Sequence, residues 1–206
     1  MPHPDRSNRR DHENLLLSTL IEQFADRSAA LREQAASEIF RIGRERAVRC
    51  ARSWLSDPVV AKLFVFDEGD FPRTTVGVGV QPEKFERIRA VNAFPPLADL
   101  PPDLDAKEFE IHAGKVRLDV LTTRDATANG ALARFLRRFG EGIQQVELNV
   151  HDVNRASATL RERFRIEPVY GEARPGADGS LVNFFLVADG NEKLLIELVE
   201  LPTRVP

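Results

Sequence analysis

A strand pattern that runs directly into a helix occurs twice in this chain, and this repeat constrains the fold more than any other feature. The clearer copy is Gly140–Val153, and a weaker copy of the same pattern lies upstream at Thr74–Glu83. A strand–helix unit that occurs twice indicates a duplicated fold, and such folds usually form their binding site between the copies. We therefore look for function where the two repeats meet.

Composition restricts the class of protein. The chain has 206 residues and is 42% hydrophobic, enough for one compact domain with an extra lobe or for two small domains. The 29 basic and 32 acidic residues leave a net charge of -3 without a dense basic block, so we expect no nucleic-acid partner. The single cysteine, Cys50, can form no intrachain disulfide and is expected to be a small buried residue on a helix.

The N-terminal part is predicted to be helical. Residues 1–13 are polar and are expected to form a flexible tail, and the apolar patch Leu15–Leu17 is too short for a signal sequence or a membrane span. The sequence therefore favours a cytoplasmic protein without a membrane partner. Apolar residues then recur at helical spacing, which predicts a helical lobe over residues 14–66 with two or three amphipathic helices and a break at Gly43.

Within this lobe, the stretch Ala30–Gly43 resembles one HEAT-type repeat, in which an arginine and small residues open a helix that ends at glycine. A single repeat of this kind cannot bury its own apolar face, because solenoids need about three or more. We therefore favour a helical cap that packs on the rest of the chain, with a fragment of a solenoid as the alternative.

Residues 72–202 are predicted to form two modules, at 72–124 and 141–202, each with a strand, a helix and further strands. In the first module Val76, Val78 and Val80 alternate with small or polar residues, as in a half-buried strand. In the second, a strand at 143–150 precedes a helix that starts at Asp152, a strand near 167–170 and a hairpin over 181–199. A helix at 129–139 links the modules. The predicted fold class is α+β.

Five segments give this chain a resemblance to a known family: Gly114–Leu121, Ala133–Leu136, Gly140–Ile143, Val150–Val153 and Ile196–Glu200. With them, residues 72–200 resemble the vicinal-oxygen-chelate superfamily of glyoxalase, bleomycin-resistance and dioxygenase folds, and within it most closely the methylmalonyl-CoA epimerase family. The resemblance implies that two βαβββ modules curl into a cup. It also implies that one side chain from each of four strands reaches inward to hold a divalent metal.

The resemblance places these four positions at Thr75, Arg117, Gln145 and Glu197, and only Glu197 is a strong metal ligand. Threonine and glutamine are weak ligands, and an arginine offers no free lone pair and carries a fixed positive charge. A guanidinium at this point would repel a divalent cation by several kcal/mol at the effective dielectric of a partly buried site. We therefore expect neither a metal nor another cofactor.

Strand alternation gives a second argument, independent of the family. If Val146 and its even-numbered neighbours face the helices, then Gln145, Glu147 and Asn149 face the other way. Arg117, Asp119, Glu197 and the glycines Gly77 and Gly79 are expected on the same face. Such a polar concave face indicates a ligand pocket, and the glycines are expected to leave room at its floor. The predicted ligand-binding residues are Thr75, Arg117, Asp119, Gln145 and Asn149.

The leading hypothesis is a small-molecule-binding protein with a degenerate metal site. Arg117, held by Glu197 and by Glu147 or Asp119, would present hydrogen-bond donors to an anionic or carbonyl-bearing ligand, such as an acyl-CoA. The competing interpretation is a purely structural ion pair between the modules.

Two alternatives belong to other functional classes. The first is an isomerase or lyase of the epimerase type, with Glu197 or Glu147 as the base and Arg117 as the partner of the oxyanion. The second is an interaction protein that works through the arginine-rich helical lobe. Exposed strand edges are compatible with a homodimer, and the sequence leaves open whether the modules pair within one chain or between two.

Overall fold

The computed structural model describes residues 6–67, 71–127, 129–190 and 192–202. Three helices come first: α1 (Arg6–Phe24), α2 (Ala29–Leu55) and α3 (Pro58–Ala61). The first module contains β1 (Thr74–Gly79), α4 (Pro82–Val91), β2 (Lys107–Ala113) and β3 (Val116–Thr122), and α5 (Ala131–Phe139) follows. The second module contains β4 (Gly142–Asn149), α6 (Val153–Phe164), β5 (Arg174–Pro175), the short 3-10 helix η1 (Ala177–Gly179), β6 (Leu181–Asp189) and β7 (Glu192–Glu200).

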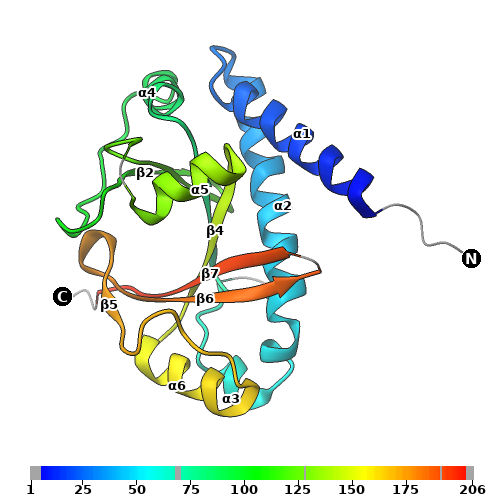
Figure 1. Cartoon of the computed structure of the whole chain (residues 1–206), viewed down its shortest axis with the longest axis vertical. Helices are drawn as coiled ribbons and strands as arrows, with labels where there is room; N and C mark the ends of the chain where they lie inside the picture. Colours follow the sequence, from blue (N-terminus) through cyan, green and yellow to red (C-terminus); the bar gives the residue numbers. More distant parts are fainter. Residues whose placement is uncertain (1–5, 68–70, 128, 191, 203–206) are drawn as a thin grey trace, which may run out of the picture.

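All strands belong to one curled sheet in the order β2-β3-β1-β4-β7-β6-β5. The first strands of the two modules pair antiparallel at its centre, where Val76 lies opposite Val146. Each of them also pairs parallel with the last long strand of its own module, β1 with β3 and β4 with β7. The two modules therefore join within one chain, and the α+β architecture predicted from the sequence is confirmed (Figure 1).

The second module differs from the prediction in one strand. The segment near residues 167–170 is irregular, and a two-residue strand, β5, takes its place further along the chain. Val169 donates one backbone hydrogen bond to the Phe184 carbonyl (2.7 Å), and the side chain of Asn183 bonds to the backbone of Tyr170. The side chain of Asn183 thus takes the place of a second backbone hydrogen bond between this segment and β6, and the segment does not form a regular strand. The helix start predicted at Asp152 is confirmed, since its carboxylate accepts from the Arg155 N–H (2.8 Å).

The predicted break at Gly43 is wrong, because α2 continues through this residue. Gly43 is buried against β1, and a Cβ atom built on it would lie 2.6 Å from Cγ1 of Val76. The glycine therefore allows helix and strand to approach closely instead of ending the helix. The first helix also differs from expectation, because α1 begins at Arg6, inside the segment predicted as a tail.

Replacing Gly43 by alanine is expected to destabilise the protein by about 1–2 kcal/mol. Alanine normally gains nearly 1 kcal/mol over glycine inside a helix, but here the new methyl group overpacks the contact with Val76. Urea unfolding followed by circular dichroism measures the change. The double variant Gly43→Ala, Val76→Ala should recover part of the loss, whereas a stabilised single variant would contradict the close contact.

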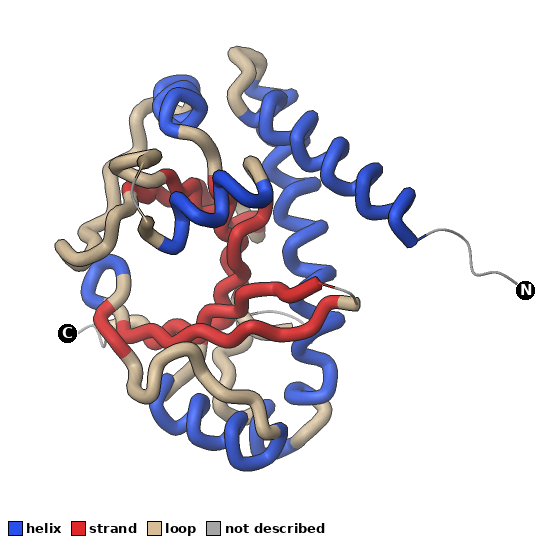
Figure 2. Tube along the Cα trace, in the orientation of Figure 1, coloured by secondary structure: helices blue, strands red, loops and turns tan. Residues whose placement is uncertain are grey.

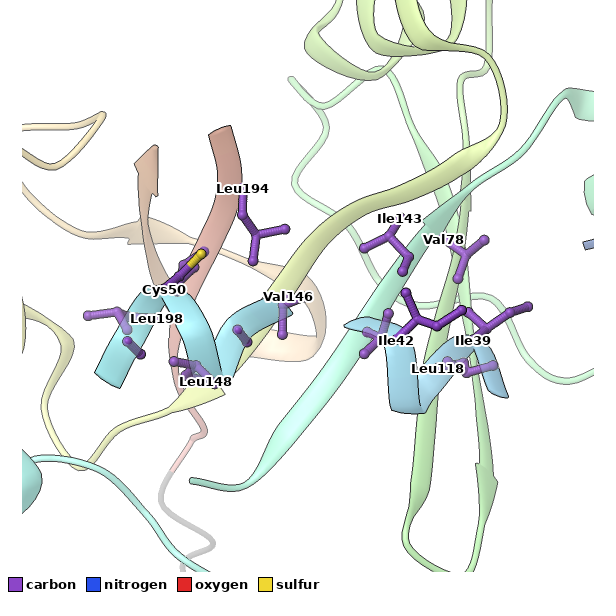
Figure 3. Packing of buried hydrophobic residues seen from close by; sticks show 14 of the residues in the cluster. Ile39, Ile42, Cys50, Val78, Leu118, Ile143, Val146, Leu148, Leu194 and Leu198 are labelled. Carbon is purple, nitrogen blue, oxygen red and sulfur yellow. The ribbon is translucent and has the colours of Figure 1, made fainter. Parts of the chain in front are cut away.

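α2 covers the convex face of the sheet and contacts strands of both modules, β1, β3, β4, β6 and β7. Figure 2 shows that the strands curl away from this helix and that their open side faces the opposite direction. In Figure 3, Ile39 and Ile42 of α2 lie against Val78 and Leu118, and Cys50 lies near Leu198. Residues of α1, α2 and the sheet form one continuous buried cluster. The helices thus pack as a cap on the sheet, and Cys50 is buried on a helix as predicted.

Several arginines of α2 pair within the chain. Arg41 contacts Glu38 and Glu45 at 2.6 Å each, and Arg46 and Arg49 reach Asp189 at the β6–β7 hairpin at 2.9 and 3.1 Å. The contacts of Arg46 and Arg49 connect α2 to the hairpin, and all three arginines have their charge paired with a carboxylate. None of the helices in the described part of the chain is long and apolar enough to span a membrane.

Candidate functional site

The concave face of the sheet forms a cavity of about 1080 Å³. Strands of both modules line it, and α5 closes one end, where Leu132 and Leu136 pack on Leu121 of β3. The predicted alternation is confirmed along β4. Val146 and Leu148 belong to the buried core, whereas the side chains predicted on the other face line the cavity: Gln145, Glu147 and Asn149, with Thr75, Arg117, Asp119 and Glu197 from the neighbouring strands.

The two glycines of β1 do not leave open space in this cavity. A Cβ atom on Gly77 would meet Cγ of Gln145 at 2.7 Å, and one on Gly79 would meet the ring of Phe135 at 3.1 Å. The glycines therefore let these two side chains lie flat on the strand. The expectation that they provide room for a ligand is wrong, because Gln145 and the linking helix fill the space.

Three carboxyl groups meet at the floor of the cavity. Glu147 is hydrogen-bonded to Asp119 on one side and to Glu197 on the other. Gln145 joins them through its amide nitrogen, which donates to Glu197 and, at 3.3 Å, to Glu147. Asp119 and Glu197 are 1% and 6% exposed, while Glu147 keeps part of its surface open to the cavity. We call Asp119, Glu147 and Glu197 the carboxyl cluster.

Burial and mutual repulsion favour protons on this cluster. Desolvation is the main cause that raises the pKa of Asp119, Glu147 and Glu197, and for Asp119 and Glu197 the negative charge of Glu147 is the next. A fourth carboxyl group, Glu108 of β2, has its pKa raised to about 8 by burial and by the charge of Glu147. Carboxyl groups whose pKa is raised by burial keep a proton at pH values where exposed carboxyl groups have lost it, and such groups can act as acid or base.

Arg117 does not bond to the carboxyl cluster. Its guanidinium contacts Asp67 at 2.7 Å, and Arg73 approaches the same carboxylate oxygen at 4.0 Å. The predicted partners Glu197, Glu147 and Asp119 are therefore wrong. Two guanidinium groups share one carboxylate at this end of the cavity, so that a net positive charge remains on the three side chains. His112, on the strand beside Arg117, contacts Glu110 at 3.0 Å.

Strand register explains why Arg117 and Glu197 are not equivalent. Val76 and Val146 lie opposite each other at the centre of the sheet, so the next residues of β1 and β4, Gly77 and Glu147, correspond. Gly77 pairs with Asp119, and Glu147 pairs with Glu197. Asp119 rather than Arg117 therefore lies at the counterpart of Glu197, and this brings the carboxyl groups together.

The resemblance implied four metal-ligand positions, and the register moves one of them from Arg117 to Asp119. Arg117 is held in an ion pair with Asp67. Gln145 donates a hydrogen bond to Glu197 through its amide NH2 group, and an NH2 group cannot bind a cation because it is a donor only. Thr75 offers only a weak neutral ligand. Within the described ranges, no three His, Cys, Asp or Glu side chains are placed to hold a metal ion.

Several residues in or beside the cavity were missed from the sequence. Glu108 lies on the same face of β2 as Glu110, a signal that alternation could have given once the strand was extended back to Lys107. Asp67 and Arg73 lie in the connection between α3 and β1. In such a connection no repeating pattern indicates which way a side chain points. The apolar wall on the other side of the cavity is formed by β6, β7 and the C-terminal end: Phe184, Leu186, Leu195, Val199 and Leu201.

Two loops meet across the open side of the sheet. Asp99, in the proline-rich segment after α4, and Asp178, in η1, exchange two hydrogen bonds of 2.8 and 2.9 Å. Arg174 of β5 also contacts Asp103 of the same segment at 2.5 Å. Because β2 and β5 are the edges of the sheet, these contacts connect the two modules on the far side from their central pairing.

Several solved structures are similar to this protein in fold. A methylmalonyl-CoA epimerase from Mycobacterium tuberculosis is 25% identical, with a TM-score of 0.52, and the match covers 63% of this chain and 87% of that one. A hypothetical protein from Bacillus halodurans is 20% identical, with a TM-score of 0.53 and coverage of 64% and 95%. The protein has the glyoxalase-like fold.

A third glyoxalase-like structure comes from Streptomyces coelicolor. It is a variant methylmalonyl-CoA epimerase in complex with 2-nitronate-propionyl-CoA, 19% identical, with a TM-score of 0.50 and coverage of 63% and 96%. The matches thus cover these proteins almost whole and leave more than a third of the present chain outside. A scan against protein-family models gave no match, and a search of curated proteins gave none either.

Proposed function

We propose that this protein binds a small molecule in the cavity of its curled sheet, at a site where the metal ligands of the fold are degenerate. The observation that carries the proposal is the cavity itself, about 1080 Å³ in size and lined by buried ionisable groups from both modules. Ligand pockets combine this size with a few convergent polar groups on an otherwise apolar wall.

The arginine end of the cavity is suited to an anionic or carbonyl group. Arg117 and Arg73 approach the single carboxylate of Asp67, which leaves donors and positive charge for a ligand. Thr75 and Asn149 line the cavity on the neighbouring strands and supply further polar contacts. Acyl-CoA thioesters are the first compounds to test, since structurally similar epimerases are named for such a substrate.

Replacing Arg117 by methionine is expected to abolish binding of an anionic ligand while unfolding stability changes by less than about 1 kcal/mol. The stability effect is small because the ion pair with Asp67 is partly exposed, 21% and 40% for the two side chains. Calorimetric titration with a panel of acyl-CoA thioesters measures binding, and Arg161→Met on α6 is the matched control. A large loss of stability with unchanged ligand responses would instead show a structural role for Arg117.

Proton-transfer catalysis is the second candidate, favoured by the raised pKa values of the carboxyl cluster. Glu147, which is only partly buried, or Glu197 would take a proton next to a thioester carbonyl, and Arg117 would stabilise the oxyanion. Incubation of acyl-CoA thioesters with the protein in deuterated water tests this directly. We expect incorporation of deuterium at the α-carbon that Glu147→Gln slows at least about tenfold; no exchange above the buffer rate would exclude this activity for the thioesters used.

A further inference from the structure

The carboxyl cluster has more acceptor oxygens than the protein satisfies. The four arginines that line the cavity within the described chain bond elsewhere: Arg117 and Arg73 to Asp67, Arg174 to Asp103, and Arg134 to the backbone carbonyl of Asn129. Among the described residues, Oδ1 of Asp119 is fully buried and has no hydrogen-bond partner. This atom is closed off from the cavity, but Glu147, which bonds to Asp119, keeps part of its surface open to it. A positive charge bound at Glu147 would offset the repulsion that favours protons on the cluster, so this floor is suited to a cationic ligand that brings hydrogen-bond donors.

An aromatic ring lies directly beside the cluster. Phe184 of β6 is the cross-strand neighbour of Glu197, and both residues line the cavity. Tyr170 packs edge-on against Phe184, with ring centroids 6.0 Å apart, and the guanidinium of Arg174 lies 4.8 Å from the centroid of the Tyr170 ring. This aromatic pair therefore already contacts one cation of the chain itself. An aromatic face beside a carboxylate is the combination that binds organic ammonium groups.

The wall beyond Phe184 is apolar and accessible. Leu186 and Leu195 are paired across β6 and β7, and Leu186 is 52% exposed although it lines the cavity. A ligand that extends from the carboxyl cluster along these strands would cover this surface. The ligand that fits this cavity should therefore have an apolar part next to its cationic group.

We propose that the ligand of this cavity is an organic amine whose ammonium group binds between Glu147, Glu197 and the ring of Phe184, with its apolar part against β6 and β7. The inference rests on the proposed binding function and adds the chemical class of the group held at the floor. It is independent of the anionic group expected at Arg117, which lies two residues before Asp119 on β3, so one ligand can carry both.

Three six-carbon probes that differ only in their end group test this proposal: hexylamine, hexanol and hexanoate. Each is titrated into the full-length 15N-labelled protein, and amide chemical shifts locate binding. We expect hexylamine to shift the resonances of Glu147, Phe184 and Leu195 with a dissociation constant at least about tenfold below that of hexanol. Glu147→Gln should remove this advantage, and Glu162→Gln, an exposed carboxylate on α6, should leave it unchanged.

Phe184→Leu keeps the apolar wall but removes the ring, and it should weaken hexylamine binding severalfold while hexanol binding stays the same. The inference is overturned, with the binding function intact, if hexanol or hexanoate shifts cavity resonances and hexylamine binds no more tightly than hexanol. If none of the three probes shifts any cavity resonance, both the inference and the proposed binding function fail.

Discussion

Replacing Trp54 by alanine is expected to lower the free energy of unfolding by about 3–5 kcal/mol. Trp54 is the only tryptophan, is 1% exposed on α2, and meets the ring of Phe185 on β6 edge-on at 6.2 Å. Truncation of this side chain would leave a cavity between α2 and the sheet, in the core that the two share. We propose that residues 14–66 and 72–202 therefore unfold as one cooperative unit.

Urea unfolding followed by circular dichroism checks this expectation. Leu31→Ala is the matched control, because Leu31 lies on the same helix but is 39% exposed, and it should cost less than about 1 kcal/mol. One transition, shifted to lower urea in Trp54→Ala, agrees with a shared core. Two transitions, with only the helical one shifted, would show that the N-terminal helices form a separate folding unit.

In the unchanged protein, the free energy of unfolding is expected to fall between pH 5 and pH 8. Replacing Glu108 by glutamine should make this fall smaller by roughly 2–4 kcal/mol. The pKa of Glu108 is raised from 4.5 to about 8 in the folded state, chiefly by burial. Between these values the folded state keeps a proton that the unfolded state loses, so stability falls as pH rises. Its contribution is fully present below the unfolded pKa and is lost as pH rises through the folded pKa.

The slope is at most about 1.4 kcal/mol per pH unit for one such group. Glutamine cannot ionise, so the stability of the variant should decline less with pH. Denaturant titrations at pH 5, 6, 7 and 8 measure both curves, and Glu162→Gln on the surface of α6 serves as control. Parallel curves for the protein and Glu108→Gln would show that Glu108 is ionised in the folded state at neutral pH.

The duplicated sheet could be predicted from the sequence because it depends on local patterns. Alternation along β4 separated Val146 from Glu147 correctly, and the same rule placed Arg117, Asp119 and Glu197 in the cavity. These assignments need only the period of two along a strand. The helical cap also followed from the spacing of apolar residues, which requires a second surface to cover them.

The partners of these side chains could not be predicted, because they depend on register between distant strands and on loops. Sequence matching paired Arg117 with Glu197, whereas the register places Asp119 at that point and leaves Arg117 to Asp67. Gly43 was interpreted as a local break, although its role is a close contact with Val76 more than thirty residues away. Such contacts leave no local pattern, so they appear only in the folded chain.

The central claim is that the cavity of the curled sheet is the functional site, and a crystallographic fragment screen tests it most directly. Crystals would be soaked with a general library that includes amines, carboxylates and neutral compounds. We expect most bound fragments to lie in the cavity, between Arg117 and the carboxyl cluster, with contacts to Phe184. Fragments that gather on the outer face of α1 and α2 while the cavity takes none would contradict the claim and favour an interaction protein.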